Sequence, residues 1–210
     1  MAVHDQMDGS FVLAEEVTES AFKQGATDAS ILHLAMHAYI DDEKPMNSKL
    51  VFHQGVDDPE DGFLHIFELC RMNSHADLAV LSACETGYGK LVKGEGIMSL
   101  ATGFSYAGVP SVVMSHWQVD DQSTSELMKL FYGYLAEGLP KSVALRKAKS
   151  DYLQVAAVNK KHPFYWAAFV VIADDSLIVT SGRWTVYLIG GLLAMVIIII
   201  GVYRWRKKSL

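Results

Sequence analysis

Short apolar runs, separated by polar and glycine-rich stretches, dominate the first 177 residues of the chain. Four of them predict buried strands, at residues 31–36, 78–82, 111–115 and 166–172. Weaker runs predict a short strand at residues 11–13 and a short edge strand at residues 50–52. Helical patterns predict helices over residues 15–24, 63–71, 97–107, 123–137 and 140–158. Because strands alternate with helices, the pattern predicts an α/β domain over residues 1–177 with a mostly parallel sheet.

The last apolar run is of a different kind. Residues 184–203 form 20 consecutive positions without a charge. As a helix this span is about 30 Å long, which matches the hydrocarbon core of a bilayer. The sequence therefore predicts a single-pass transmembrane helix, with residues 178–183 as a linker and residues 204–210 as a basic tail. A buried core helix is the alternative, and so long a stretch without charge disfavours it.

Charge is divided unevenly along the chain. Five of the 18 basic residues flank the apolar span, so residues 1–182 carry 13 basic residues against all 24 acidic ones, a net charge of −11. An acidic domain disfavours nucleic acid as a partner. It suits basic peptides, although an acidic surface that simply faces solvent is an equal alternative.

The tail and the N-terminus point to different membrane orientations. A basic tail after the span predicts a cytoplasmic C-terminus, which places the folded domain outside. The first ten residues lack the basic start and apolar stretch of a signal peptide. Two expectations stay open: a tail-anchored cytosolic domain, or the C-terminal part of a longer secreted precursor.

Reactive residues follow three of the predicted buried strands. His37 follows residues 31–36, Cys84 follows residues 78–82, and Asp120 and Asp121 follow the third strand. In open α/β sheets, active groups gather beyond the carboxyl ends of the strands. Cys84 is then a candidate nucleophile as its thiolate, with His37 as the proton donor to a leaving amine. Taken alone, a cysteine at a strand end is more often an inert core residue.

The same edge of the predicted sheet also offers groups for an oxyanion hole and for binding a substrate side chain. Backbone N–H groups near Cys84 and in the turn after His37 form the natural oxyanion hole. An acidic side chain at the end of the third strand suits a basic substrate side chain.

Other chemistries fit the sequence less well. His65, Cys70 and His75 lack the paired spacing of a zinc site, and His33 is better explained as a hydrogen-bonded core histidine. The glycine-rich stretch at residues 87–96 lacks the spacing of a phosphate-binding loop, and a loop beside the active site explains it better. The sequence predicts neither a metal nor a cofactor.

Five motifs are similar to those of one known family. They are His-Leu-Ala-Met-His-Ala (33–38), Val-Leu-Ser-Ala-Cys-Glu-Thr-Gly (80–87), Gly-Glu-Gly (94–96), Trp-Gln-Val-Asp-Asp (117–121) and His-Pro-Phe-Tyr-Trp-Ala-Ala-Phe (162–169). In this order they resemble the CHAT domain, a bacterial caspase-like module often fused to tetratricopeptide repeats. The resemblance covers residues 9–174.

The resemblance implies a caspase-like three-layer fold with His37 and Cys84 as the catalytic pair. It also implies that the backbone of Ala38 and Cys84 forms the oxyanion hole, and that Asp121, beside Asp120, binds a basic P1 residue. Met36, Ala38 and His116 depart from the family pattern, and Ala38 stands where many relatives have glycine. The family's first strand is expected before residue 9, so this chain is expected to be part of a longer, repeat-containing protein.

The leading hypothesis is a membrane-anchored cysteine endopeptidase that cleaves a protein or peptide after a basic residue. Its control is expected to come from a tetratricopeptide-type sensor, either fused or separate. The second hypothesis is a non-catalytic interaction module tethered to the membrane, which the presence of both His37 and Cys84 disfavours. A redox or zinc protein is the third.

Overall fold

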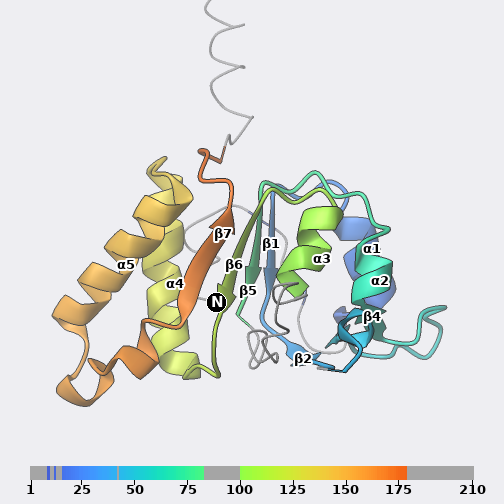
Figure 1. The fold of residues 1–210 in the computed structure, drawn as a ribbon, viewed down its shortest axis with the longest axis horizontal. Helices are drawn as coiled ribbons and strands as arrows, with labels where there is room; N and C mark the ends of the chain where they lie inside the picture. The colour runs from blue at the N-terminus through green and yellow to red at the C-terminus, as the bar shows by residue number, and fades with distance from the viewer. Residues whose placement is uncertain (1–8, 10–11, 13–15, 42, 83–99, 179–210) are drawn as a thin grey trace, which may run out of the picture. The chain divides into compact units, whose positions relative to one another are not determined.

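The computed structural model describes residues 9, 12, 16–41, 43–82 and 100–178 (Figure 1). The predicted linker beyond Ile178, the transmembrane helix at residues 184–203 and the basic tail lie outside these residues, and so does most of the strand expected at residues 11–13. Among the described residues, no helix is both long enough and apolar enough to cross a membrane. The membrane anchor and the domain limits therefore stay predictions.

The central sheet has four strands in the order β1-β5-β6-β7. Their bounds are β1 Ile31–Leu34, β5 Leu78–Leu81, β6 Ser111–Ser115 and β7 Phe169–Ala173. The first three strands are parallel, and β7 runs antiparallel to β6. This confirms the mostly parallel sheet. The last strand is reversed because two helices, rather than one, separate it from β6. The chain therefore returns to the end at which β6 finishes, and Phe169 at the start of β7 pairs with Ser115.

Helices cover both faces of this sheet (Figure 1). On one face lie α1 Glu19–Gly25, α2 Ile66–Leu69 and α3 Leu100–Tyr106, and on the other lie α4 Asp121–Ala136 and α5 Lys141–Val155. Short 3-10 helices occur at η2 Pro45–Asn47, η3 Val158–Lys160 and η4 Pro163–Tyr165. The three-layer α/β arrangement expected from the sequence is therefore present.

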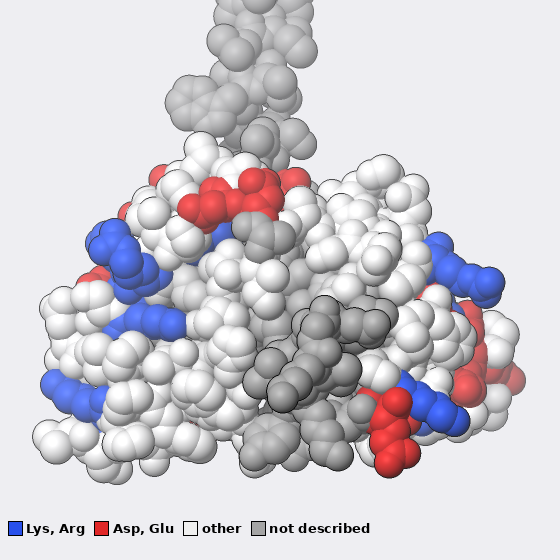
Figure 2. All heavy atoms as spheres, in the orientation of Figure 1, with Lys and Arg blue, Asp and Glu red and all other residues white. Residues whose placement is uncertain are grey.

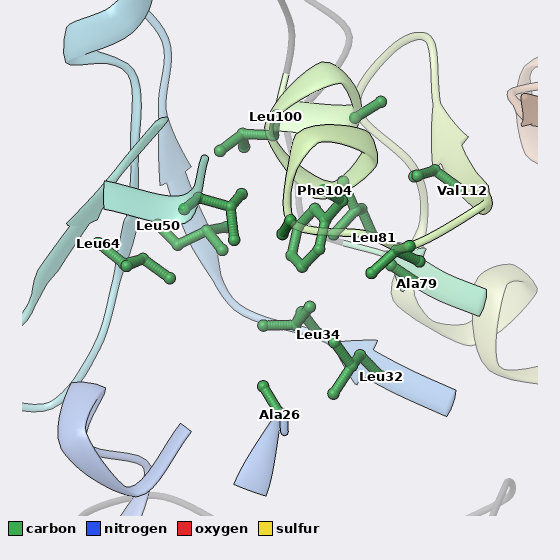
Figure 3. Close-up of a cluster of buried hydrophobic side chains, with 14 of the residues drawn as sticks. Ala26, Leu32, Leu34, Leu50, Leu64, Ala79, Leu81, Leu100, Phe104 and Val112 are labelled. Atoms are coloured by element: carbon green, nitrogen blue, oxygen red, sulfur yellow. The ribbon is translucent and has the colours of Figure 1, made fainter. Parts of the chain in front are cut away.

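Strand β5 shows why its sequence is uniformly apolar. Ala79 and Leu81 join the core beneath α1, α2 and α3, whereas Leu78 and Val80 join the core beneath α4 and α5. All four side chains are fully buried. Figure 3 shows the first of these cores, where Leu81 lies near Phe104 of α3. A strand covered on both faces needs no polar alternation, which accounts for the continuous apolar run.

A second, smaller sheet was not predicted. It contains β2 His37–Tyr39, β3 Lys49–Val51 and β4 Phe63–His65, in the order β2-β3-β4 with both pairs antiparallel. The strand expected at residues 50–52 is confirmed as β3, but it is the central strand here. The helix predicted over residues 63–71 is wrong in its first part, because Phe63–His65 pair with β3 and α2 begins only at Ile66.

Two other boundaries differ from the prediction for local reasons. Helix α1 begins at Glu19 rather than near residue 15, because the hydroxyl of Thr18 accepts a hydrogen bond from the N–H of Ala21 and caps the helix there. The last strand begins at Phe169 rather than at residue 166, because residues 166–168 form a turn after η4 Pro163–Tyr165.

Candidate active site

Strands β1 and β5 end side by side. Leu34 and Leu81, the last residues of the two strands, are paired in register. The N–H of Ser82 also donates to the carbonyl oxygen of Leu34 at 3.0 Å, so the pairing continues one residue further. His37 follows Leu34 by three positions, and Cys84 follows Leu81 by three positions. The chain thus leaves β1 and β5 at the same edge of the central sheet, three positions before His37 and three positions before Cys84 in the sequence.

The structure describes only one member of this pair. His37 opens strand β2 and its side chain is exposed. Cys84 lies outside the described residues, as does the whole of residues 83–99. The catalytic roles of His37 and Cys84 therefore stay predictions, supported by the strand ends that lead to them.

The small sheet fixes the direction in which His37 points. His37 pairs with Val51 of β3, and Ala38 pairs with Leu50. Successive residues of a strand point to opposite faces, so Ala38 turns toward the core, where it packs against the buried cluster that contains Leu50. His37 and Tyr39 share the opposite, exposed face. The oxyanion role predicted for the Ala38 backbone is not tested by this arrangement.

His33 has a structural role that differs from that of His37. Its Nδ1 lies 2.8 Å from the hydroxyl of Tyr132 on α4, and its Nε2 lies 3.0 Å from the hydroxyl of Ser82. The predicted hydrogen bonding is confirmed, but the side chain is exposed rather than in the core. Protein atoms still crowd the ring, and this loss of hydration lowers its pKa to about 4. A neutral His33 therefore joins α4, β1 and the end of β5 at neutral pH.

The sequence pattern did not point to Tyr132 or Ser82. Tyr132 reads as one more apolar position of a helix, and it is indeed buried. Ser82 carries a weak signal, because a hydroxyl at the end of an otherwise apolar run must find a hydrogen-bond partner when the strand is buried. The sequence around Tyr132 and Ser82 does not show that both hydroxyls bond to His33, because that contact depends on the fold.

Asp120 is held by three contacts at the start of α4. Its Oδ2 accepts hydrogen bonds from the N–H of Ser123 at 2.9 Å and from its hydroxyl at 2.8 Å, so Asp120 is the N-cap of the helix. Its Oδ1 lies 2.7 Å from the Nζ of Lys160. The bond from Lys160 and those from Ser123 lower the pKa of Asp120 to about 2.

Asp121 is placed differently. It is the first residue of α4, its side chain is exposed, and it has no hydrogen bond or ion pair with another residue that the structure describes. Of the two predicted P1-binding carboxylates, Asp121 is the one whose charge is not already matched within the described part of the chain. The P1 role of both residues stays a prediction.

One tryptophan joins the turn before α4 to the segment before β7, and a second closes a turn within that segment. The indole N–H of Trp117 donates to the carbonyl oxygen of Phe164 at 3.0 Å, and that of Trp166 donates to the carbonyl oxygen of Lys161 at 3.0 Å. Two of the motifs singled out in the sequence, residues 117–121 and 162–169, therefore meet in space. Their contacts hold the turn that carries Asp120 and Asp121 in place.

A cluster of charges lies apart from these strand ends. The Nζ of Lys23 lies 2.7 Å from Glu19, 3.0 Å from Glu60 and 3.4 Å from Glu68. Burial alone would lower the pKa of Lys23, but the hydrogen bonds to Glu19 and Glu60 raise it above its ordinary value. The ammonium group thus supplies a positive charge among three carboxylates and links α1 to α2.

These carboxylates also have the spacing of metal ligands, since one oxygen from each lies within 4.8 Å of the others. Within the described ranges they form the one group of that kind. The zinc alternative built on His65, Cys70 and His75 is therefore not supported by the positions of those side chains. His65 instead directs its Nδ1 to the carbonyl oxygen of Asn47 at 3.0 Å.

Comparison with known proteins gives a consistent result. A family model described as "CHAT domain" matches residues 2–174. "Tetratricopeptide repeat protein 28" of Mus musculus is 29% identical over 108 residues, which cover 51% of this chain and 4% of that protein. The protein of the same name from Homo sapiens is 32% identical over 98 residues, which cover 47% of this chain and 4% of that protein. The chain thus spans only a small part of the length of these curated relatives.

Proposed function

The chain belongs to the CHAT domain family, whose model covers most of its length, and from that premise we propose that it is a cysteine endopeptidase. His37 and Cys84 are its catalytic pair. The observation that carries the proposal is the register of Leu34 against Leu81, because each candidate residue follows its paired leucine by the same three positions. A nucleophile and a base on neighbouring strand ends are what the chemistry of a cysteine peptidase requires.

The proposed reaction has two stages. The Cys84 thiolate bonds to the scissile carbonyl carbon, and the oxygen that becomes negative accepts hydrogen bonds from the backbone N–H groups of Ala38 and Cys84. The C–N bond then breaks as His37 gives its proton to the leaving amine. In the second stage His37 takes a proton from water as the water oxygen bonds to the thioester carbonyl carbon. The C–S bond then breaks, which releases the acid and restores the Cys84 thiolate beside protonated His37.

The proposed P1 specificity rests on charge at the start of α4. A basic P1 side chain needs a carboxylate that is not already neutralised, and Asp121 meets this condition within the described residues. Asp120 instead pairs with Lys160 and caps the helix. We therefore assign direct P1 binding to Asp121 and a supporting position to Asp120.

Anchoring and control are further parts of the proposal. Residues 184–203 hold the peptidase at a membrane as a single transmembrane helix, with the basic tail at residues 204–210 on the cytoplasmic side by the positive-inside rule. The names of the mammalian relatives support a tetratricopeptide-type region, fused or separate, as the regulator. On the face in Figure 2, the described basic and acidic side chains lie in small separate groups.

Cleavage of an arginine-containing peptide library by the full chain tests the proposal, with Cys84→Ala as the matched variant. We expect cleavage after arginine or lysine that Cys84→Ala lacks. Equal turnover by both proteins would refute the peptidase and leave the non-catalytic interaction module.

A thiol-reactive peptide electrophile provides a second test that does not need turnover. Burial raises the pKa of the Cys70 thiol, which disfavours its reactive thiolate form and makes Cys70 a suitable internal control. We expect labelling that survives Cys70→Ser and disappears in Cys84→Ala. Labelling that follows Cys70 instead would contradict a reactive Cys84.

A further inference from the structure

His37 shares the exposed face of the small sheet with residues that the proposed reaction does not use. The register places His37, Val51 and Phe63 in one row across the three strands, and Tyr39, Lys49 and His65 in the next row. These six residues are called the β2–β3–β4 face below. The row between them points the other way, and its members Leu50 and Leu64 are fully buried. The face is therefore supported by the core beneath it.

Lys49 is the centre of the β2–β3–β4 face. Its Nζ lies 3.8 Å from the ring centroid of Phe63 and 5.9 Å from that of Tyr39. Both rings are open to solvent, Tyr39 at 57% and Phe63 at 37% of their full exposure. No carboxylate among the described residues forms an ion pair with Lys49. An ammonium group held by two aromatic rings, without an anion, suits an acidic side chain flanked by apolar groups.

The aromatic surface continues beyond Phe63. His65 stacks on Phe67 of α2, with ring centroids 5.0 Å apart and planes 18° from parallel. Phe67 is also exposed. Large aromatic side chains that stay open to water, next to a cation without a carboxylate partner in the described ranges, are typical of surfaces that bind a peptide.

The order of the central strands tells which part of a substrate reaches this face. Cys84 follows β5, which lies between β1 and β6. His37 follows β1 on one side, and Asp121 follows β6 on the other. A substrate with its P1 side chain at Asp121 therefore has its leaving amine toward His37. The residues after the scissile bond run on past His37, onto the β2–β3–β4 face.

We propose that the β2–β3–β4 face binds the substrate segment that follows the scissile bond and that Lys49 selects an acidic residue there. This inference rests on the proposed peptidase function. Lys49 is one strand across and two residues along from His37, which corresponds to about 8 Å. An extended peptide covers that distance in two to three residues. The acidic residue is thus expected at the second or third position after the cleaved bond.

Paired peptides test this specificity. Each pair has arginine at P1 and differs only in glutamate or lysine at the second and third positions after the scissile bond. We expect the full-length wild-type chain to favour glutamate, and Lys49→Glu to shift the ratio of kcat/KM for the two peptides by about tenfold toward lysine, because a repulsion replaces an attraction. Lys129→Glu is the matched control, since Lys129 is exposed on α4 across the central sheet. It should keep the wild-type ratio.

Equal kcat/KM for the two peptides with wild type, or the same shift in Lys49→Glu and Lys129→Glu, would overturn the inference while leaving the peptidase intact. If neither peptide is cleaved, the proposed function fails, and binding of the fluorescently labelled glutamate peptide to Cys84→Ala decides the inference separately. Binding that Lys49→Glu reduces about tenfold in this background supports the β2–β3–β4 face as a peptide site. Absent binding, or binding that both lysine variants leave equal, refutes it.

Discussion

The Nζ of Lys160 lies 2.7 Å from Oδ1 of Asp120, which joins the short helix after α5 to the first turn of α4. The same carboxylate caps α4 through Ser123. A side chain with these partners stabilises the turn that presents Asp121 to solvent. The two neighbouring acids of this turn therefore have separate tasks, one in the fold and one in the proposed binding of substrate.

Replacing Asp120 by alanine should lower the free energy of unfolding by about 1 kcal/mol, because the N-cap of α4 is lost. Urea denaturation of the two proteins measures the difference. Asp121→Ala is the control at the next position, and it should cost less because Asp121 has no partner within the described part of the chain. Equal losses for the two variants would contradict the assignment of Asp120 as the cap.

Asp121→Ala should reduce cleavage after arginine selectively. The variant loses the carboxylate proposed to pair with the basic P1 side chain, so kcat/KM for arginine peptides should fall at least about tenfold relative to peptides with a neutral P1 residue. Asp120→Ala, measured under conditions where it is folded, should keep the preference for arginine. An unchanged P1 preference in Asp121→Ala would refute the assignment.

His37 and His33 should differ sharply in catalysis. His37→Ala removes the proposed proton donor, and the rate of peptide cleavage should fall by about 10²–10⁴-fold. His33→Gln removes a ring that bridges Tyr132 and Ser82, and its effect should be on stability instead. Rates per folded molecule, with the folded fraction taken from circular dichroism, separate the two cases. If His33→Gln abolishes cleavage and His37→Ala does not, His33 rather than His37 is the proton donor.

His33 should make stability depend on pH in the acidic range. Its pKa is about 4 in the folded chain and about 6.5 without the fold, so the unfolded chain binds the proton more readily. The contribution of neutral His33 is present above pH 6.5 and is lost as the pH falls toward 4. We expect the urea midpoint of wild type to fall more steeply over this interval than that of His33→Gln.

The matched control for this prediction is His75→Gln, because His75 is an exposed histidine in a loop. It should retain the wild-type pH dependence between pH 6.5 and 4. If the pH dependence of the urea midpoint is lost in His75→Gln but remains in His33→Gln, the role given to His33 is wrong.

Gly108 should be the least replaceable of the described glycines that have a positive φ angle. Its φ is +99°, and an added Cβ would lie 2.9 Å from the carbonyl oxygen of Ser74. Gly108→Ala should therefore destabilise by about 1–3 kcal/mol through strain and a backbone clash. Gly138 has a φ of +82° but open space around the added Cβ, so Gly138→Ala separates the two causes. Similar thermal midpoints for both variants would show that the clash with Ser74 is unimportant.

Much of the central sheet follows from local sequence. The run at Leu78–Leu81 is apolar at every position because both faces of β5 are covered, and β6 has the bounds that its sequence predicts. Membership of the CHAT domain family also follows from motifs visible in the sequence. The reversed direction of β7 does not, because it depends on how α4 and α5 return the chain.

The small sheet marks the limit of local prediction. Each of its strands has only three residues, too few for an alternating pattern to distinguish a strand from a helix turn. Its pairing joins Tyr39, Lys49 and His65 across loops whose sequence carries no sign of the partner strand. For the same reason the β2–β3–β4 face could not be found before the register was known.

The amino-acid sequence by itself determined the three-layer class, the strands that lead to His37 and Cys84, and the family. Those features depend on hydrophobic pattern and on motifs that neighbouring residues carry. Tertiary structure alone decided that Asp120 is already paired, that His33 is a bridge, and that His37 shares a face with Lys49. Each of these depends on contacts between residues far apart in the chain, and such contacts exist only once the core has brought the strands and helices together.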